Sequence, residues 1–400
     1  MEEIAALPPG SASLFSVVLK ILILQDILRS GGTERQTILL TKGLLANGLD
    51  AQLITFRPGG ALASLAAGLP GGPPGPPSAA VGLSAGAVKL PGGALQQPDR
   101  GWDWYSPGLV KRLRRERPDA VLAMGRMANC RLGWLNAGRA VKIATFRTGK
   151  PLPWLYRRAL RTAGQVIANS EEAARTLRDA YGVPGNKITV IYNGLVFPGV
   201  AGQSRRLAVR AELGAGPGTT VFLCVAMFRP EKRQVELVEI FAGLPAGLDW
   251  HLWLAGDGSA RAAAELRVQE LGLKDRIKFT GFRADPTELY AAADAAVHAS
   301  ESEALSNFLI EAQAHGLPVI AYDAQGVAEC FAPDRTGWLI RRDDRAAFRA
   351  AAERVLGTLP AAREIWQADA AQFARDRFDA DRQIGAYVDL LRRLQSGAPS

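Results

Sequence analysis

Two glutamates eight residues apart, Glu303 and Glu311, flank the start of an expected helix in the second half of the chain. Between them Ser306 precedes the apolar run 308–310, and a serine at this position favours a helix N-terminus. The free backbone N–H groups and the dipole of such a helix start attract a phosphate. Because carboxylates accept hydrogen bonds from sugar hydroxyls, the pair suits a sugar diphosphate joined to a ribose. A rise of about 1.5 Å per residue would separate the two glutamates by roughly 12 Å.

Two cations, Arg229 and Lys232, follow the first strand expected in the second half, residues 220–226. Ligands of open parallel sheets bind at the carboxyl ends of the strands, so both side chains would reach a diphosphate beside the helix start. There they would offset the negative charge left on the diphosphate when a glycosidic bond breaks. The alternatives are that the cations are ordinary surface residues and that the glutamates lie solvated on a helix face.

A glycine pair, Gly31 and Gly32, follows the first expected strand of the chain. Without side chains these residues would let the backbone approach a ligand between two domains, although a plain turn is the alternative. No GxGxxG motif follows this strand, so we expect no nicotinamide or flavin cofactor. The sequence also offers no Ser-His-Asp, Cys-His or metal-ligand arrangement, and we expect neither a cofactor nor a metal.

Strands and helices alternate in both halves, which is typical of an α/β protein with parallel sheets covered by helices. The chain divides into an N-terminal extension (1–14), a first domain (15–200), a second domain (201–375) and a final helix (376–400). Within the first domain, the Pro- and Gly-rich stretch 58–93 is expected to form a long loop.

The expected elements follow the apolar runs and the turn residues. In the first half, strands are expected at 17–25, 51–56, 120–123, 141–146, 165–168 and 188–191, and helices at 34–47, 108–116 and 171–181. In the second half, strands are expected at 220–226, 250–255, 277–280, 295–298 and 319–321, and helices at 234–241, 260–270, 288–293, from 306 onward and at 361–394. Two glycine-containing segments, 326–329 and 337–340, are either turns or covers that close over the site.

The composition, with 48% hydrophobic and 22% charged residues, is that of a globular protein. A chain of 400 residues is too long for one ordinary core and favours two or three domains. The most apolar run, 14–24, contains Lys20 and is shorter than the roughly 20 residues of a membrane-spanning helix, so we expect a buried strand. The three cysteines lie far apart and favour no disulfide framework. The acidic start Met1-Glu2-Glu3 is unlike a secretory signal, and we expect a cytoplasmic protein.

The charge is unevenly distributed along the chain. Residues 1–200 hold 24 Lys or Arg and 12 Asp or Glu, whereas residues 201–400 hold 24 and 27. Most of the excess lies between Lys111 and Arg161, interleaved with tryptophan and tyrosine. This combination is expected of a surface that rests on anionic lipid headgroups, here the inner face of the cytoplasmic membrane. Nucleic acid would attract the same charges, although we expect none as a partner; Arg-rich helices that simply solvate one face are the remaining alternative.

Six motifs occur in one order along nearly the whole chain. They are Gly31-Gly32-Thr33-Glu34-Arg35, Asn169-Ser170 with Ile191-Tyr192-Asn193-Gly194, Arg229-Pro230-Glu231-Lys232, Leu254-Ala255-Gly256-Asp257-Gly258, Phe279-Thr280-Gly281-Phe282, and Glu303 followed after seven residues by Glu311-Ala312. With these motifs the chain resembles the retaining glycosyltransferases of family 4, which have the GT-B fold. The resemblance implies two Rossmann-like domains whose parallel sheets face each other across a cleft, and a C-terminal helix that returns to the N-terminal domain.

The resemblance also implies that the N-terminal domain binds an acceptor and the C-terminal domain binds a UDP- or GDP-linked sugar. By it, Arg229 and Lys232 bind the diphosphate, Glu303 contacts the donor sugar and Glu311 contacts the ribose. Further donor contacts are expected from Gly32, Gly281, Phe282, Arg283, Leu305, Ser306 and Asn307. Transfer to a lipid-linked or envelope saccharide would retain the anomeric configuration without a protein nucleophile, because the leaving diphosphate assists departure and deprotonates the acceptor.

Two residues depart from the family's pattern. Arg147 follows a strand where the family often has a histidine, and with Gly31 it is a candidate contact to the acceptor or the sugar. Ala304 stands where glycine is frequent, which changes the fine shape of the sugar pocket. Two other functions stay open: a nucleotide-sugar 2-epimerase of the same fold, which would convert the donor without an acceptor, and a non-catalytic basic protein that binds membranes or nucleic acid.

Overall fold

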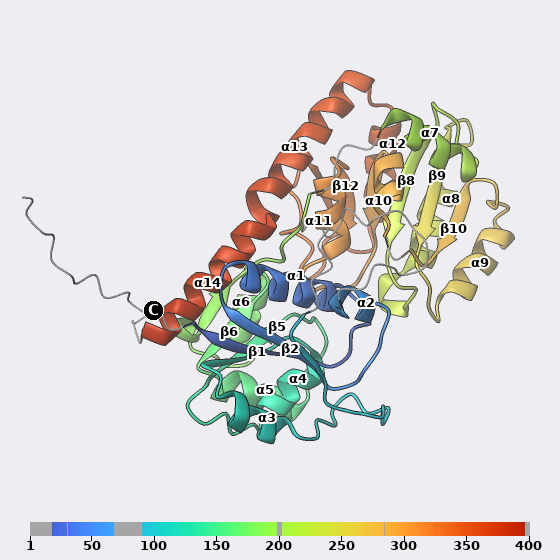
Figure 1. The fold of residues 1–400 in the computed structure, drawn as a ribbon. Coiled ribbons are helices and arrows are strands. Elements are labelled where there is room, and N and C mark those ends of the chain that lie inside the picture. Colours follow the sequence, from blue (N-terminus) through green and yellow to red (C-terminus); the bar gives the residue numbers. More distant parts are fainter. Residues whose placement is uncertain (1–17, 30, 68–89, 198–201, 284, 397–400) are drawn as a thin grey trace, which may run out of the picture.

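Two parallel sheets, each covered by helices on both faces, form the protein (Figure 1). The computed structural model describes residues 18–29, 31–67, 90–197, 202–283 and 285–396. Each sheet is built from one half of the chain, so the expected α/β architecture of two Rossmann-like halves is confirmed. The expected N-terminal extension, 1–14, lies outside the described residues.

The first sheet has seven parallel strands in the order β3-β2-β1-β4-β5-β6-β7. They are β1 (Lys20–Gln25), β2 (Asp50–Thr55), β3 (Gly92–Ala94), β4 (Ala120–Ala123), β5 (Val141–Phe146), β6 (Gln165–Ala168) and β7 (Ile188–Val190). The strand order reverses between β1 and β4, and ligands of such sheets bind at the carboxyl ends of the strands near that point. The segments after β1, β5 and β6 are therefore placed for binding.

Helices pack on both faces of this sheet. One face carries α1 (Gly32–Ala46), α2 (Ala63–Ala67) and α14 (Ala380–Ser396), and the other carries α3 (Leu109–Glu116), α4 (Arg126–Leu132), α5 (Trp154–Thr162) and α6 (Glu171–Asp179). The expectation that 58–93 is one long loop is wrong at its two ends, because α2 and β3 lie there; residues 68–89 are outside the described part. Helices α4 and α5 were not expected from the sequence.

Asp26 explains why a helix starts at Arg126. Its carboxylate, just beyond β1, accepts hydrogen bonds from the N–H groups of Met127 and Ala128 at 3.0 and 2.7 Å. A side-chain oxygen thus satisfies N–H groups of the first turn of α4, as an N-cap would, but from a residue far away in the sequence. A capping partner of this kind cannot be read from the helix sequence.

The second sheet has six parallel strands in the order β10-β9-β8-β11-β12-β13. They are β8 (Thr220–Val225), β9 (Trp250–Ala255), β10 (Ile277–Gly281), β11 (Ala295–His298), β12 (Val319–Tyr322) and β13 (Gly337–Ile340). One face carries α8 (Gln234–Ala242), α9 (Arg261–Glu270) and α12 (Arg345–Leu356), and the other carries α7 (Gln203–Glu212), α10 (Thr287–Ala292), α11 (Asn307–Ala314) and α13 (Pro360–Phe378). Segment 337–340 is the edge strand β13, so the idea that it closes over the site is wrong.

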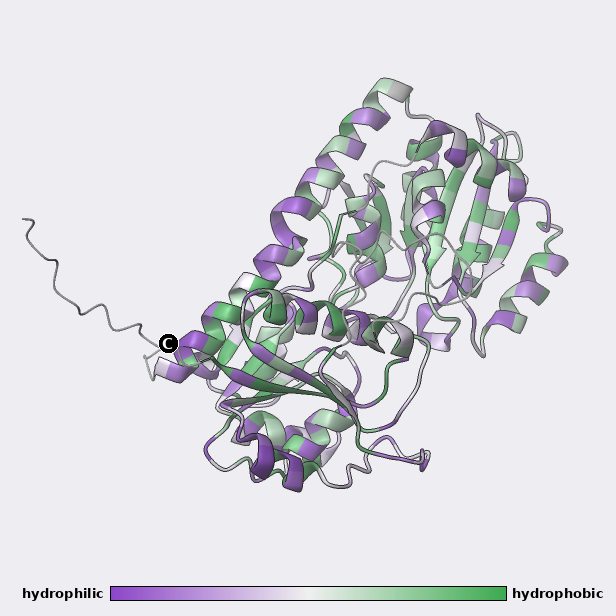
Figure 2. Cartoon of the chain, in the orientation of Figure 1, coloured by the Kyte–Doolittle hydropathy of each residue, from purple (hydrophilic) through white to green (hydrophobic). Residues whose placement is uncertain are grey.

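The strands owe their formation to apolar runs that are buried on both faces, as parallel sheets require. Strand β9 is buried along its whole length, and its Trp253 is fully inaccessible. Figure 2 shows the strands of both sheets mostly in green, while the outer helices carry purple, hydrophilic residues. The hydrophobic cores therefore lie between the sheets and their helices, and the strand ends are left to carry polar side chains.

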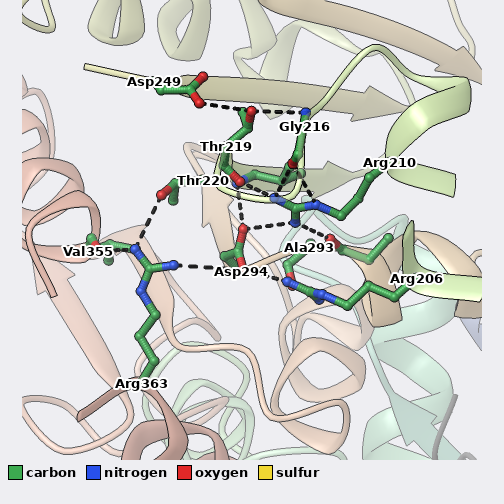
Figure 3. Close-up of polar contacts among 12 residues, drawn as sticks. Arg206, Arg210, Gly216, Thr219, Thr220, Asp249, Ala293, Asp294, Val355 and Arg363 are labelled. Atoms are coloured by element: carbon green, nitrogen blue, oxygen red, sulfur yellow. Dashed lines mark hydrogen bonds and ion pairs between the residues drawn. The ribbon is translucent and has the colours of Figure 1, made fainter. Parts of the chain in front are cut away.

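A buried ion cluster joins the helices of the second sheet to its strands (Figure 3). The carboxylate of Asp294, at the start of β11, accepts from Arg206 at 2.6 Å, from Arg210 at 3.1 Å and from the N–H of Val221 at 2.8 Å. Arg210 is only 2% exposed, and Arg363 of α13 approaches Asp294 from the other side. The cluster fixes α7 against the core.

The C-terminal segment 361–394 was expected to be helical, and it forms two helices that meet at Asp379. There the extended backbone of Asp379 (φ −61°, ψ 135°) interrupts the helix and pairs with Leu195, which leads out of the first sheet. Helix α13 packs on the second sheet, and α14 packs on α1 of the first (Figure 1, red). The predicted return of a C-terminal helix to the N-terminal domain is confirmed.

Candidate functional site

A cleft of about 400 Å³ is lined by residues that follow strands of both sheets. It contains twelve of the predicted site residues: Gly31, Gly32, Arg147, Arg229, Lys232, Phe282, Arg283, Glu303, Leu305, Ser306, Asn307 and Glu311. The remaining one, Gly281, ends β10 directly before Phe282. The structure therefore brings together residues that lie up to 280 positions apart in the sequence, counted from Gly31 to Glu311.

Glu303 forms the centre of the polar side of this cleft. Its Oε1 accepts a hydrogen bond from the Lys232 ammonium group and lies 2.9 Å from Nε2 of His298. His298 ends β11, and its ring is buried, whereas the glutamate is partly exposed toward the cleft. Lys232 comes from the loop after β8, the strand next to β11. Neighbouring strands thus hold one carboxylate between a cation and a histidine.

The protonation states follow from these contacts. Burial opposes ionisation of Glu303, but His298 and Lys232 outweigh it and lower the pKa of the carboxyl to about 2. Burial lowers the pKa of His298, while its hydrogen bond to Glu303 acts in the opposite direction. At neutral pH the arrangement is a neutral histidine that donates from Nε2 to an ionised glutamate. The cleft therefore presents a fixed negative charge beside the Lys232 cation.

Glu311 has a different environment, about one turn into α11. Burial raises the pKa of its carboxyl, and the Arg35 charge and a hydrogen bond from Tyr290 oppose that shift. The Tyr290 hydroxyl donates to Oε2 of Glu311 at 2.7 Å, and both residues line the cleft. The two glutamates are thus held by separate sets of partners, at separate points of the same cleft.

The start of α11 departs in one respect from the expected phosphate site. Ser306 occupies the N-cap position, but within the described part of the chain its side chain makes no capping hydrogen bond. Its backbone N–H points instead to the Sγ atom of Cys330, at 3.3 Å. Ser306 therefore lies at the N-cap position that the sequence predicts, although its side chain does not cap the helix. The phosphate-contact prediction for Leu305, Ser306 and Asn307 stays a prediction.

Gly32 meets Asn307 across the cleft. A Cβ atom on Gly32 would lie 1.9 Å from Nδ2 of Asn307, so a larger residue here would force the Asn307 side chain to move. The Oδ1 atom of Asn307 accepts from Nδ2 of Asn193 at 2.7 Å, and Asn193 follows β7. Gly32 therefore brings the backbone at the start of α1 against the start of α11. Its predicted approach to a ligand stays a prediction.

Arg147 lies in the cleft with its terminal nitrogens engaged by the protein. It donates to Oδ1 of Asn193 and, at 2.8 Å, to the hydroxyl of Tyr387 on α14. The guanidinium thus ties the end of β5 to the C-terminal helix. Its predicted contact to a sugar or an acceptor is untested and stays a prediction, and so does the contact predicted for Gly31.

Glycines allow two loops that follow strands of the second sheet to pack closely against each other. Gly256 and Gly258 have φ angles of +140° and +146°, which disfavour other residues. A Cβ atom on them would lie 2.0 Å from the Ala226 carbonyl oxygen and 2.3 Å from that of Phe228. The Gly256-Asp257-Gly258 turn therefore packs directly on the loop that carries Arg229 and Lys232, and holds that loop in place.

Glu329 joins the two domains beside the cleft. Its carboxylate accepts from the N–H groups of Glu171 and Glu172 at 2.9 and 2.8 Å, at the start of α6 in the first domain. The Tyr192 hydroxyl donates to the same carboxylate at 2.6 Å. In return, the Glu172 carboxylate accepts from the N–H of Gly326 at 2.7 Å. Segment 326–329 is therefore a turn that fastens the domains together, rather than a cover of the site.

Sequence reasoning missed several residues of the site. Arg35 and Tyr290 line the cleft near Glu311, and His298 holds Glu303, although none of the three was assigned a role. Arg35 lies in the glycine-pair motif and His298 directly precedes the double-glutamate segment, so both positions were available as signals. Tyr290 had no such signal, because its position follows from the packing of α10 against α11.

Two further features bear on the range of functions. Among the described residues, no group of three or more His, Cys, Asp or Glu side chains is arranged to hold a metal ion. Within the same part of the chain, each helix is too short or too polar to cross a lipid bilayer.

Comparison with known proteins extends these observations. The family model for Glycosyltransferase Family 4 matches residues 30–196, and the model for Glycosyl transferases group 1 matches residues 206–371. The lipopolysaccharide core biosynthesis glycosyltransferase LpsD of Rhizobium meliloti (strain 1021) is 34% identical over 176 residues, which cover 43% of this chain and 50% of that protein. The corresponding enzyme LpsE of the same organism is 29% identical over 253 residues, 62% of this chain and 69% of that protein.

The chain spans about half the length of LpsD, the first of these relatives, in the aligned region. Among solved structures, that of Anabaena Alr3699/HepE in complex with UDP covers 94% of this chain and 100% of that chain, with a TM-score of 0.73 and 22% identity. This likeness shows the GT-B fold. Because the two family models together extend over both sheets and the cleft between them, the chain belongs to glycosyltransferase family 4.

Proposed function

We propose that the protein transfers a sugar from a UDP- or GDP-linked donor to a saccharide or glycolipid acceptor of the cell envelope, with retention of the anomeric configuration. The observation that carries this proposal is the ionised Glu303, held by Lys232 and His298 at the wall of the cleft. Family membership and the lipopolysaccharide relatives support the substrate class. The UDP bound to the HepE neighbour supports a uridine donor as the first to be tested.

Each end of the donor has partners in the cleft. Arg229 and Lys232 are placed for the diphosphate, and Glu303 for hydroxyls of the sugar, because a carboxylate fixed between two donors still has free lone pairs. Glu311 is placed for the ribose hydroxyls. Phe282 and Arg283, which follow β10, are placed for the base. These assignments rest on position in the cleft and on the family resemblance.

The bond changes can be balanced without a protein nucleophile. The acceptor hydroxyl oxygen forms a bond to the anomeric carbon while the bond from that carbon to the diphosphate breaks, and both events occur on the same face. The proton of the acceptor passes to an oxygen of the departing diphosphate, whose negative charge Arg229 and Lys232 stabilise. Glu303 would hold the sugar in place during this exchange. We propose that transfer needs no metal, since these two cations neutralise the diphosphate.

We further propose that the protein works at the inner face of the cytoplasmic membrane, with its basic first domain against anionic lipid. Exposed cations on α3 and α5 support this orientation: Lys111, Arg114, Arg115, Arg157, Arg158 and Arg161. Arginine and lysine near a bilayer surface each contribute about 1 kcal/mol of attraction to anionic lipid. Such a position would place a lipid-linked acceptor near the cleft.

A melting-temperature screen with UDP, GDP, ADP and their common sugars would identify the donor, because a ligand that binds only the folded state raises its stability. The screen is followed by turnover assays with the selected donor and an extract of envelope glycolipids. Loss of turnover in the double variant Glu303→Ala, Lys232→Ala is expected, with Arg335→Ala, an exposed residue of the second domain, as the control. Turnover that survives the double variant would overturn the proposal.

Further measurements test the stereochemistry, the epimerase alternative and the dependence on a metal. Proton NMR of the product gives the anomeric configuration, and inversion would contradict the proposed stereochemistry. Conversion of the donor sugar without any acceptor would instead identify the 2-epimerase. Turnover that a chelator abolishes, and a divalent cation restores, would contradict the proposal of a metal-independent reaction.

A further inference from the structure

A second cavity, of about 450 Å³, lies on the helix-covered face of the first sheet that carries α3 to α6. Its walls come from the loop 104–107, from α4 and from the start of α5, and include Trp104, Met127 and Trp134. Among the described residues, none that lines this cavity also lines the cleft. The volume is in the range of small-molecule sites, which run from about 300 to 1,000 Å³. The first domain therefore has room for a ligand of its own.

The walls of this cavity favour an apolar ligand. Tyr105, Met127 and Leu155 contribute apolar surface, and the two polar side chains in the wall are bonded to each other: Nε of Arg131 donates to Oγ of Ser106 at 2.8 Å. A sugar ring would bring many hydroxyl groups and find few partners, and each unsatisfied group costs free energy. A hydrocarbon chain would lose no hydrogen bonds by entering.

Exposed tryptophans surround the mouth of the cavity. Trp102 and Trp104 are both 56% exposed, Trp134 is 61% exposed and Trp154 is 64% exposed. They stand in two pairs, with Trp102 stacked on Trp104 and Trp134 edge-on to Trp154, at ring separations of 5.6 and 6.0 Å. Clustered exposed apolar side chains of this size mark interaction surfaces, and tryptophan is the residue enriched at the boundary between lipid and water.

Cations beside the tryptophans supply charge complementarity to an anion. Arg126, on α4, and Arg157 and Arg158, on α5, are exposed, and each is steadied by a hydrogen bond to a backbone carbonyl oxygen. Carboxylates in this part of the first domain already have partners, and that of Asp26 accepts from the backbone N–H groups of Met127 and Ala128. Asp103 pairs with Arg29 and Arg57, and Glu116 pairs with Lys20 and Arg115. The electrostatic potential at the mouth of the cavity is therefore positive, which favours binding of a lipid phosphate.

We propose that this cavity binds one acyl chain of an anionic glycerophospholipid, with the lipid phosphate at Arg158 and the four tryptophans in the headgroup layer. Apolar walls, paired tryptophans and unneutralised arginines occur together at this place, and each matches one part of such a lipid. The proposal deepens the membrane orientation proposed above and rests on it, although the site is separate from the cleft and needs no donor or acceptor.

The test uses the full chain and a short-chain phosphatidylglycerol below its critical micelle concentration, so that single lipid molecules are offered. Titration calorimetry is expected to show saturable binding. Met127→Trp, which fills the cavity, and Arg158→Ala, which removes the cation, are each expected to weaken it roughly tenfold, about 1.4 kcal/mol. Leu266→Ala and Arg335→Ala, exposed positions in the second domain, are the matched controls and are expected to bind as the wild type does.

A comparison of two lipids tests the role of the arginines, and a comparison of the wild type with Met127→Trp tests the cavity. Short-chain phosphatidylcholine is expected to bind more weakly than phosphatidylglycerol, and equal binding would overturn the role of the arginines. Failure of monomeric lipid to bind the wild type, or unchanged binding in Met127→Trp, would overturn the cavity site. Vesicle binding that persists in that variant would then show a general membrane surface. Binding of UDP, measured on the same samples, reports on the cleft and on folding, so failure of this proposal is distinguishable from failure of the proposed function.

Discussion

His298 lies behind Glu303, with Nε2 2.9 Å from Oε1, so that a buried ring supports a carboxylate that faces the cleft. His298 also borders the cleft, and the one hydrogen bond of its ring among the described residues is with Glu303. Its second ring nitrogen, Nδ1, has no hydrogen-bond partner within the described residues. The ring is therefore held by packing, against Phe308 among others, and by its single polar contact.

His298→Phe should keep the packing and remove the hydrogen bond to Glu303. Loss of one hydrogen bond to a charged group costs about 1.5 to 3 kcal/mol, so we expect kcat/KM for the sugar donor to fall by roughly tenfold or more. His298→Gln, which can donate to Glu303 again, should recover part of the loss. The control is His251→Phe, a buried histidine of β9. Equal activity in His298→Phe and the wild type would show that Glu303 functions without the hydrogen bond to His298.

The acid stability of the fold should depend on Glu303. Its pKa in the folded protein, about 2, is below the ordinary value of 4.5, so the unfolded state binds more protons between these pH values. Stability therefore falls as the pH drops from about 5 toward 2, and we expect this residue to account for roughly 2 to 3 kcal/mol of the loss. Urea unfolding at pH 7 and pH 4 measures the onset of this loss, which at pH 4 amounts to roughly 0.8 kcal/mol for this residue.

In Glu303→Gln, the loss of stability between pH 7 and pH 4 should be smaller than in the wild type. Glu353→Gln, an exposed glutamate on α12, is the control and should leave the pH dependence unchanged. Parallel pH profiles for Glu303→Gln and the wild type would contradict the lowered pKa.

Gly32→Ala should disturb the closed arrangement of the domains. The added Cβ atom would lie 1.9 Å from Nδ2 of Asn307, and the bond from Asn193 to Asn307 would have to break or shift. We expect roughly tenfold weaker binding of the nucleotide, about 1.4 kcal/mol, measured by calorimetry. Gly385→Ala is the control, because no described atom lies within 4 Å of the added group and alanine favours a helix. Nucleotide affinity that stays unchanged in Gly32→Ala would argue against this contact.

Asp294→Asn should destabilise the second domain. Arg210, 2% exposed, would keep its charge but lose the carboxylate that pairs with it (Figure 3). Breaking a buried ion pair on one side costs about 3 to 5 kcal/mol, and we expect a loss of that size in urea unfolding. Asp389→Asn, on the exposed side of α14, should change stability by less than about 0.5 kcal/mol. A loss near zero in Asp294→Asn would mean that Arg206 and Arg210 find other partners.

Glu329→Gln should loosen the contact between the domains. The amide offers one acceptor oxygen where the carboxylate has two, and the bonds from Glu171, Glu172 and Tyr192 cannot all remain. We expect a larger radius of gyration in small-angle X-ray scattering without ligand, and a partial return to the wild-type value with bound nucleotide. Glu239→Gln, which pairs within the second domain, is the control. Identical scattering of Glu329→Gln and the wild type would contradict this prediction.

The sequence predicts the cleft well because its signals are local. Gly32, the strand before Arg229 and the segment around Glu303 each mark the carboxyl end of a strand, and that end faces the cleft in a parallel sheet. Most strands are recognised because they are apolar throughout.

The features that the sequence does not predict depend on contacts between residues that lie far apart in the chain. Helix α5 buries only Tyr156, Ala159 and Leu160, and the arginines between them hide its periodicity. The bonds of His298 and Lys232 to one oxygen of Glu303 depend on which strands are neighbours in the sheet, which the order of residues does not state. Glu329 caps a helix that begins more than 150 residues earlier, and no local pattern predicts such a partner.

The crossing of the chain at Asp379 also affects how the protein is made. During synthesis the first domain leaves the ribosome early, yet Ile384, Tyr387 and Leu391 of α14, which complete its core, emerge only after the second domain. Until then α1 would expose the apolar groove that these residues fill. The core of the N-terminal domain is therefore complete only after α14 has been made, and deletion of α14 would damage a domain that begins more than 350 residues earlier in the sequence.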